Sequence, residues 1–184
     1  TECLYQFHRH KFIDERNVLG KLSSHLRIEV LRELRYGILI KVRFLKCANS
    51  GFLDLLLDRL EELHARPDQV ICFQGEIGDR FFILHRGRVR VLITNERTGS
   101  QKVLAMLDAG SFFGEVALLE KKARIASVVT VSFCDLFFIR KERWDEVAYL
   151  CPEVENHIRG VGTKRAEETR RRSVGGGSKP ASSQ

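Results

Sequence analysis

The fold is decided by the stretch Phe113-Gly114-Glu115-Val116-Ala117-Leu118-Leu119, which a short spacer separates from Arg124-Ile125-Ala126-Ser127-Val128. Gly114 allows a sharp turn, and the residues after it can open a short helix whose free N–H groups attract a phosphate. Glu115 supplies an acceptor for a sugar hydroxyl, and Arg124 supplies a charged planar fork for phosphate oxygens. This stretch therefore suits a pocket for a small anionic ligand. The alternative is an ordinary strand–turn–strand in which Glu115 and Arg124 pair with each other or with solvent.

Residues N-terminal to this stretch have the apolar spacing of helices. Across 14–46 the leucines, isoleucine and valine recur at helical intervals, and Asp14 and Ser24 stand where N-cap residues are expected. A second amphipathic helix follows Gly51, carries Leu63 on its apolar face and ends before the next proline. The sequence thus predicts a helical N-terminal third.

From residue 67 to about residue 140 the pattern changes to short β runs separated by glycines and polar turns. Helical spacing resumes at Lys141 and breaks at Pro152, and a last helix is predicted over 153–172. The glycine- and serine-rich end, 173–184, is predicted to be a disordered tail. The layout is α+β, a small antiparallel roll flanked by helices. The predicted strands are 70–73, 80–85, 89–94, 103–107, 127–131 and 135–139.

Several segments together identify a family. The 113–128 stretch resembles the phosphate-binding cassette of cyclic-nucleotide-binding domains, whose usual form is Phe-Gly-Glu, two small or apolar residues, Leu-Leu, a spacer and Arg-Thr-Ala-Ser-Val. The run Pro67-Asp68-Gln69-Val70-Ile71-Cys72-Phe73-Gln74-Gly75-Glu76-Ile77-Gly78-Asp79, with Phe82-Ile83-Leu84 after it, is similar to the start of the β-roll in cyclic-nucleotide-gated channels. Phe12-Ile13-Asp14-Glu15 and the leucines after it resemble the helical C-linker of these and of hyperpolarisation-activated channels. The resemblance covers residues 5–172.

The resemblance implies a jelly-roll-like antiparallel β-roll with flanking helices, preceded by part of a C-linker. Three segments follow from it: 1–46 as the partial helical C-linker, 47–172 as the cyclic-nucleotide-binding domain, and 173–184 as the tail. By the same resemblance the segment is a ligand sensor of a tetrameric cation channel, in which closure of the last helix over the nucleotide passes through the linker to a pore. Residues 5–46 are then expected to contact other subunits.

The resemblance also assigns the pocket residues. Glu115 accepts from the ribose 2′-OH and Arg124 pairs with a phosphate oxygen, while Arg165 on the last helix contacts the purine. The expected ligand contacts are Gly114, Glu115, Val116, Ala117, Arg124, Ile125, Leu107 and Arg165. Further candidates are Ala105, Ser127, Lys164 and Glu168, although Ser127 fits a structural role equally well and the charged residues of the last helix also fit a solvated face.

Ile125 departs from the family pattern, which has threonine there. Isoleucine cannot hydrogen-bond the phosphate or the amino group of a syn guanine, and an apolar pocket discriminates only weakly between ligands. Adenosine 3′,5′-cyclic monophosphate (cAMP) is therefore expected to be favoured over the guanosine form (cGMP), without strong selectivity.

Composition and the absence of certain sequence motifs narrow the range of expected functions and partners. The net charge of +7 favours anionic partners. The six histidines show no metal-ligand grouping, and no hydrolase or nucleotide-phosphate motif is present, so neither a metal site nor an enzyme is expected. The basic run before Ser173 is a weak nucleic-acid signal, and no nucleic-acid partner is expected. No apolar run approaches the ~20 residues that span a bilayer. The segment is expected to be soluble, on the cytosolic side of a membrane-embedded parent chain.

Arg170-Arg171-Arg172-Ser173-Val174 fits the consensus of a basophilic kinase, so Ser173 is a candidate phosphorylation site. Two other interpretations of the whole chain stay open. One is a roll of the same shape that binds no nucleotide because its own chain fills the pocket, as in related voltage-gated potassium channels. The other is the regulatory domain of a cation exchanger.

Overall fold

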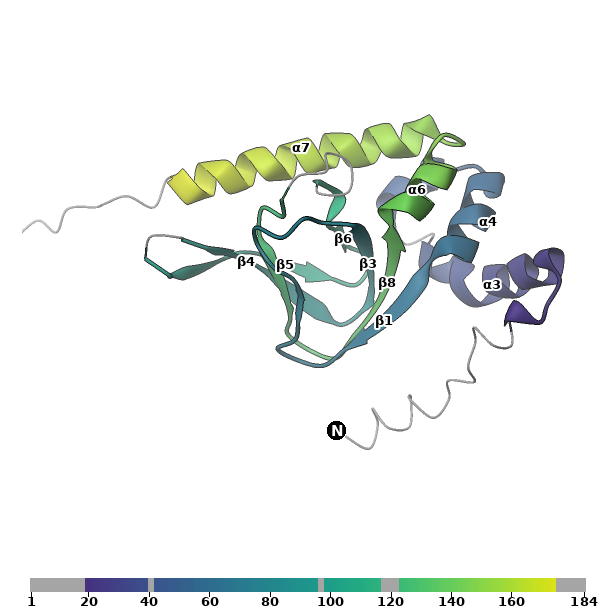
Figure 1. Cartoon of the computed structure of the whole chain (residues 1–184), viewed down its shortest axis with the longest axis horizontal. Coiled ribbons are helices and arrows are strands. Elements are labelled where there is room, and N and C mark those ends of the chain that lie inside the picture. Colours follow the sequence, from purple (N-terminus) through teal and green to yellow (C-terminus); the bar gives the residue numbers. More distant parts are fainter. Residues whose placement is uncertain (1–18, 40–41, 96–97, 117–122, 175–184) are drawn as a thin grey trace, which may run out of the picture.

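The computed structural model describes residues 19–39, 42–95, 98–116 and 123–174. Figure 1 shows strands forming a roll in the middle, the N-terminal helices gathered at one end, and a long C-terminal helix running along the roll. The helical elements are α3 (Ser24–Leu39), the 3-10 helix η1 (Arg43–Cys47), α4 (Ser50–Arg59), α6 (Lys141–Ala148) and α7 (Pro152–Val174).

In the described residues, eight strands form two four-stranded sheets in which every pairing is antiparallel. Their orders are β1-β8-β3-β6 and β2-β7-β4-β5. The predicted α+β roll with flanking helices is confirmed. The strands are β1 (Glu61–Ala65), β2 (Val70–Cys72), β3 (Arg80–Arg86), β4 (Arg88–Thr94), β5 (Gln101–Asp108), β6 (Phe112–Phe113), β7 (Ser127–Thr130) and β8 (Cys134–Arg140).

Strand β3 explains how the two sides of one sheet are used. Successive side chains of a strand point to opposite faces. Phe81 and Ile83 lie in the buried cluster shared with the helices, whereas Phe82 and Leu84 lie in the cluster inside the roll. A strand that is covered on both faces needs a continuous apolar run rather than an alternating one, which is what β3 has.

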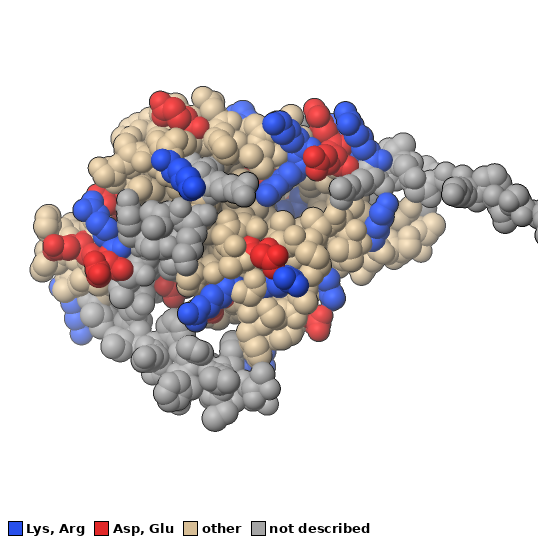
Figure 2. Space-filling view, turned by 180° about the vertical axis from the view of Figure 1, so that it is seen from behind, with Lys and Arg blue, Asp and Glu red and all other residues tan. Residues whose placement is uncertain are grey.

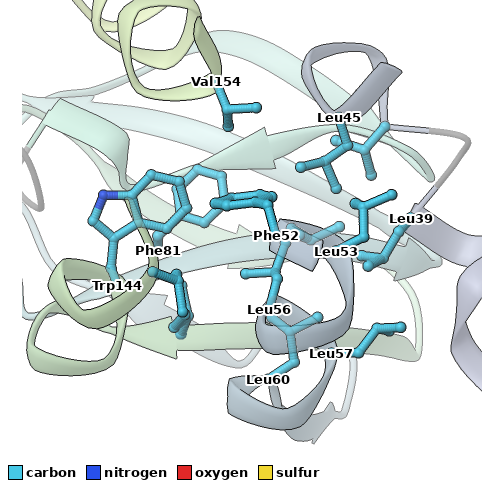
Figure 3. Packing of buried hydrophobic residues seen from close by; sticks show 14 of the residues in the cluster. Leu39, Leu45, Phe52, Leu53, Leu56, Leu57, Leu60, Phe81, Trp144 and Val154 are labelled. Carbon is cyan, nitrogen blue, oxygen red and sulfur yellow. The ribbon is translucent and has the colours of Figure 1, made fainter. Parts of the chain in front are cut away.

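The helices are fixed to the roll through aromatic contacts. Trp144 on α6 is 1% exposed, and its ring centroid lies 6.1 Å from those of Phe52 on α4 and Phe81 on β3. Figure 3 shows these rings meeting beside Val154 of α7, with the leucines of α4 continuing the same cluster. α4, α6 and α7 therefore share one core with the outer face of the β1-β8-β3-β6 sheet.

The prediction was wrong between residues 61 and 65. The second helix was expected to include Leu63 and to end before residue 67, but α4 ends at Arg59 and β1 follows it. Leu63 is paired with Leu136 of β8. Because a strand depends on a partner distant in sequence, the leucine spacing alone favoured a longer helix. The short strand β6 was missed for the same reason.

The ends of the other helices were partly predicted. The chain turns at Lys21 and Leu22, and Ser23 rather than Ser24 caps α3, since the Leu26 N–H donates to Ser23 Oγ at 3.4 Å. Asp14 lies outside the described residues, and the segment predicted as one helical region contains α3 and η1 separately. The helix α7 extends to Val174, so Ser173 and Val174 belong to it and not to the tail.

Candidate functional site

A cavity of about 200 Å³ lies between the second sheet, the cassette and α7. It collects residues from β2, β4, β5 and β7 on one side and from α7 on the other. Most of the expected ligand contacts line it. The lining residues are Cys72, Val91, Leu104, Ala105, Leu107, Phe113, Gly114, Glu115, Val116, Arg124, Ile125, Ala126, Val128, Arg165, Glu168 and Thr169.

Gly114 stands where the backbone passes very close to Arg124. Its φ is +87°, which favours glycine, and an added Cβ would lie 2.5 Å from Arg124 Nη1 and 2.9 Å from the Arg80 carbonyl oxygen. A larger residue would push the guanidinium or the strand away. Gly114 is thus required both for the turn and for the position of Arg124.

The Arg124 side chain is buried and partly bonded. It is 6% exposed, and its Nη1 and Nη2 groups donate to the carbonyl oxygens of Gly114 at 3.2 Å and Arg80 at 2.9 Å. Its Nε is buried and makes no hydrogen bond, but it forms an ion pair with Glu76 Oε1 at 3.7 Å. A guanidinium has five N–H donors, so this one is held by the backbone while retaining donors for an anion.

Glu115 is also buried, at 3% exposure. Its Oε1 accepts from Arg165 Nη1 at 3.1 Å. The same nitrogen donates to the Phe112 carbonyl oxygen at 2.8 Å, and the Arg165 guanidinium carbon lies 4.6 Å from the centre of the Phe112 ring. The main partners of Glu115 and Arg124 are therefore neither solvent nor each other. Arg165 ties α7 to the cassette.

Gly162 on α7 is a second point of close approach. A Cβ there would lie 3.2 Å from Glu115 Cγ and 3.4 Å from Val116 Cγ2, whereas Gly160 has nothing within 4 Å. Val154 and Ile158, in the first two turns of α7, are fully buried. The start of the helix is thus anchored in the core. Beyond Ile158, Gly162 approaches the cassette, and Arg165, Glu168 and Thr169 line the cavity.

Two candidate residues, Ser127 and Lys164, lie outside the cavity lining. Ser127 does not line the cavity, and its Oγ accepts from the Gln74 N–H at 2.9 Å, which is a structural role. Lys164 is exposed and outside the cavity lining, so of the two charged alternatives only Glu168 reaches it. Ala117 lies outside the described residues. For Ser173 the backbone is helical, and its side chain is not described.

Sequence reasoning missed several lining residues, among them Cys72, Phe113 and Thr169. Cys72 and Phe113 flank predicted turns, and their apolar character signalled only core positions. Burial raises the pKa of the Cys72 thiol to about 11, against a smaller lowering by the nearby Arg124 guanidinium. The thiol therefore stays protonated at neutral pH and forms part of the apolar wall.

The raised pKa of Cys72 predicts a loss of stability in alkali. In the unfolded chain this thiol ionises near its ordinary value of 9.0, whereas in the folded chain it keeps its proton up to about 11. The free energy of unfolding should therefore fall between these pH values, by roughly 2 kcal/mol at most. Urea unfolding of the wild type and Cys72→Ala at pH 8, 9 and 10 checks this. A parallel pH dependence in the two proteins would contradict it.

The surface charge, the possible metal ligands and the length of the helices bear on other functions. On the face seen from behind, the Lys and Arg side chains of the described residues are interspersed with Asp and Glu (Figure 2) and form no continuous basic stripe among those residues. Within the ranges 19–39, 42–95, 98–116 and 123–174, no three His, Cys, Asp or Glu side chains gather as metal ligands. In the same ranges, none of the helices combines the length and the apolar character needed to cross a bilayer.

Residues 62–148 match the family described as the cyclic nucleotide-binding domain. These residues belong to that family. The match begins in β1 and ends with α6, and it contains both Glu115 and Arg124. The cyclic nucleotide-binding domain thus accounts for both sheets and for the cassette.

Individual relatives agree with this assignment. The chain is similar to Cyclic nucleotide-gated channel beta-1 of Homo sapiens, with 30% identity over 158 residues, which cover 84% of this chain and 12% of that protein. The chain therefore spans about an eighth of the length of that relative. Its domain is homologous to domains of such channels.

Two solved structures share the fold. One is a regulatory subunit of a cAMP-independent protein kinase A from Trypanosoma brucei, with a TM-score of 0.70 and 20% identity, covering 80% of this chain and 53% of that one. The other is the regulatory domain of Toxoplasma gondii protein kinase A with cAMP, with a TM-score of 0.67 and 21% identity, covering 76% of this chain and 51% of that one. These similarities support the fold, and not a particular ligand.

Proposed function

We propose that this cyclic nucleotide-binding domain binds a 3′,5′-cyclic nucleotide, with cAMP favoured over cGMP, and regulates a cation channel. The observation that supports binding is the buried Arg124, a cation that lines the cavity and has more N–H donors than its two backbone carbonyl partners use. An anion bound in the cavity accepts charge-assisted hydrogen bonds from such donors.

The cavity has a polar end and an apolar side. Arg124 and the backbone at Gly114 take the cyclic phosphate, and Glu115 accepts from the ribose hydroxyl. Leu107 and Ala105 of β5 form the apolar wall for the base. A ligand site of this kind places a few polar groups in a largely apolar lining.

Entry of the nucleotide changes the partners of Arg165. The cavity of about 200 Å³ is smaller than the roughly 300–1,000 Å³ typical of small-molecule sites. In this arrangement Arg165 already donates a hydrogen bond to Glu115, the proposed ribose acceptor. The ribose hydroxyl therefore shares or replaces that bond. Arg165 then turns toward the base, with Glu168 and Thr169 at the rim.

The nucleotide preference depends on Ile125. Titration calorimetry should give a cAMP affinity about 2- to 10-fold above that for cGMP, because one net hydrogen bond of roughly 0.5–1.5 kcal/mol is missing for guanine. The Ile125→Thr variant restores a hydroxyl and should raise cGMP affinity by a similar factor. Leu107→Met, a change of similar volume in the same wall, is the matched control. Equal affinity for the two nucleotides in the wild type would refute the preference.

Regulation follows from the contacts of α7. Its anchored start contacts η1, and η1 follows α3 in the linker-like segment. Ligand-dependent closure of the end of α7 shifts a population of two arrangements, with typical couplings of ~1–3 kcal/mol. We place the subunit contacts of a tetramer in residues 5–46, of which 5–18 and 40–41 lie outside the described residues, and the domain on the cytosolic side of its membrane.

The alternative is that this domain has the same fold but binds no nucleotide, because its own chain fills the pocket. The Arg165–Glu115 pair favours this alternative, because a native side chain already bonds to the proposed ribose acceptor. Absence of heat on titration with either nucleotide would favour this function. A cation exchanger as the parent chain remains the other alternative.

A further inference from the structure

The end of α7 carries a charged motif that nucleotide binding does not use. Arg170 and Arg171 are exposed, and they precede Ser173 by three and two residues, with the apolar Val174 after it. Guanidinium groups at these positions suit the acidic substrate groove of a basophilic serine kinase, since Arg pairs with carboxylates bidentately. The motif begins directly after Glu168 and Thr169, which line the cavity.

We propose that Ser173 is phosphorylated by a basophilic serine kinase, and that this modification opposes closure of α7 over the cavity. In the reaction the Ser173 Oγ attacks the γ-phosphorus of a nucleoside triphosphate. The bond to the bridging oxygen breaks, the diphosphate leaves, and the hydroxyl proton passes to the base of the kinase. The coupling to closure rests on the proposed function, whereas the phosphorylation site itself does not.

The helical state of the motif makes phosphorylation depend on conformation. Kinases of this class bind their substrates extended, but Ser173 lies in the last turn of α7. The last four carbonyl groups of a helix lack intrahelical donors, and helix ends open at low free-energy cost. The kinase therefore acts on the unwound last turn. A nucleotide packed against Glu168 and Thr169 reduces the fraction of chains in which that turn is open.

The phosphate acts on the same equilibrium from the other side. It adds a charge of about −1.5 to −2 at neutral pH, at the helix end where the macrodipole is already negative. A like charge there disfavours the helical turn. Arg170, three residues earlier, offsets part of this effect. The net result is a less stable helix end beside the rim of the cavity.

The site is tested on the full 184-residue chain with a purified basophilic serine kinase that is active without cyclic nucleotide, with the phosphate mapped by mass spectrometry. One phosphate is expected at Ser173 and none in Ser173→Ala. Arg170→Ala should slow the reaction about tenfold. Arg159→Ala, which removes another exposed arginine of α7, should leave the rate unchanged. Absence of phosphate at Ser173, or equal rates for the two arginine variants, would overturn the site.

The coupling is tested by repeating the reaction with saturating cAMP, alongside calorimetry on phosphorylated and unmodified chains. We expect phosphorylation to slow about fivefold or more, and phosphorylated chains to bind cAMP more weakly by a similar factor. A peptide of residues 165–178 should show no response to cAMP, which checks the kinase itself. Nucleotide binding with an unchanged rate would overturn the coupling alone. Absence of binding to the unmodified chain would overturn the proposed function, and the coupling with it, but not the site.

Discussion

Replacing Arg124 with alanine is expected to weaken binding of a cyclic nucleotide by roughly 10- to 150-fold, because the lost charge-assisted contact is worth about 1.5–3 kcal/mol. The side chain is buried, so solvent cannot replace its charge. Titration calorimetry with cAMP measures the change. An affinity within twofold of the wild type would show that Arg124 does not bind the phosphate.

The same substitution has a structural cost that must be separated from the loss of affinity. Arg124 satisfies the carbonyl oxygens of Gly114 and Arg80, and leaving such groups unpaired costs about 1–3 kcal/mol. Arg124→Lys keeps the charge but loses the planar fork. It should retain more affinity than the alanine variant. Urea unfolding of each protein shows which fraction of chains is folded during the titration.

The roll and its cassette could be predicted because local residues determine them. Turn glycines separate the β runs. Gly114, Glu115 and Arg124 bring a turn residue, a hydrogen-bond acceptor and a cation together in a short stretch, which suits an anionic ligand. The structure brings these three to one cavity. By contrast, β1 could not be predicted, because its helix-like leucine spacing is overridden by pairing with β8, a strand distant in the sequence.

The contact between Arg165 and Glu115 was also beyond the sequence. The resemblance to cyclic-nucleotide-gated channels assigns Arg165 to the purine, but its bond to Glu115 depends on how α7 lies across the cassette. Gly162 sets that distance, since a Cβ there would press on Glu115 and Val116. A glycine in a helix usually signals weak helix formation. Only the packed structure distinguishes Gly162, where a neighbour approaches, from Gly160, where none does.

Gly114→Ala should have the largest effect of any single methyl group added to the cassette. Gly114 and Gly75 have nearly the same φ, +87° and +86°. Alanine at either position pays about 1–2 kcal/mol for the left-handed backbone. At Gly75 nothing lies within 4 Å of the new Cβ, whereas at Gly114 it meets Arg124 Nη1 and the Arg80 carbonyl. Overpacking of this kind adds roughly 1–3 kcal/mol.

The pair of variants separates backbone strain from displacement of the guanidinium. Gly75→Ala should lower the free energy of unfolding and leave the affinity of the folded protein for cAMP near that of the wild type. Gly114→Ala should lower stability further and also reduce affinity about as much as Arg124→Ala, because the guanidinium can no longer lie against the turn. Urea unfolding and calorimetry on both proteins give the two quantities. If Gly114→Ala matched Gly75→Ala in both, the phosphate site would not depend on the close contact between this turn and Arg124.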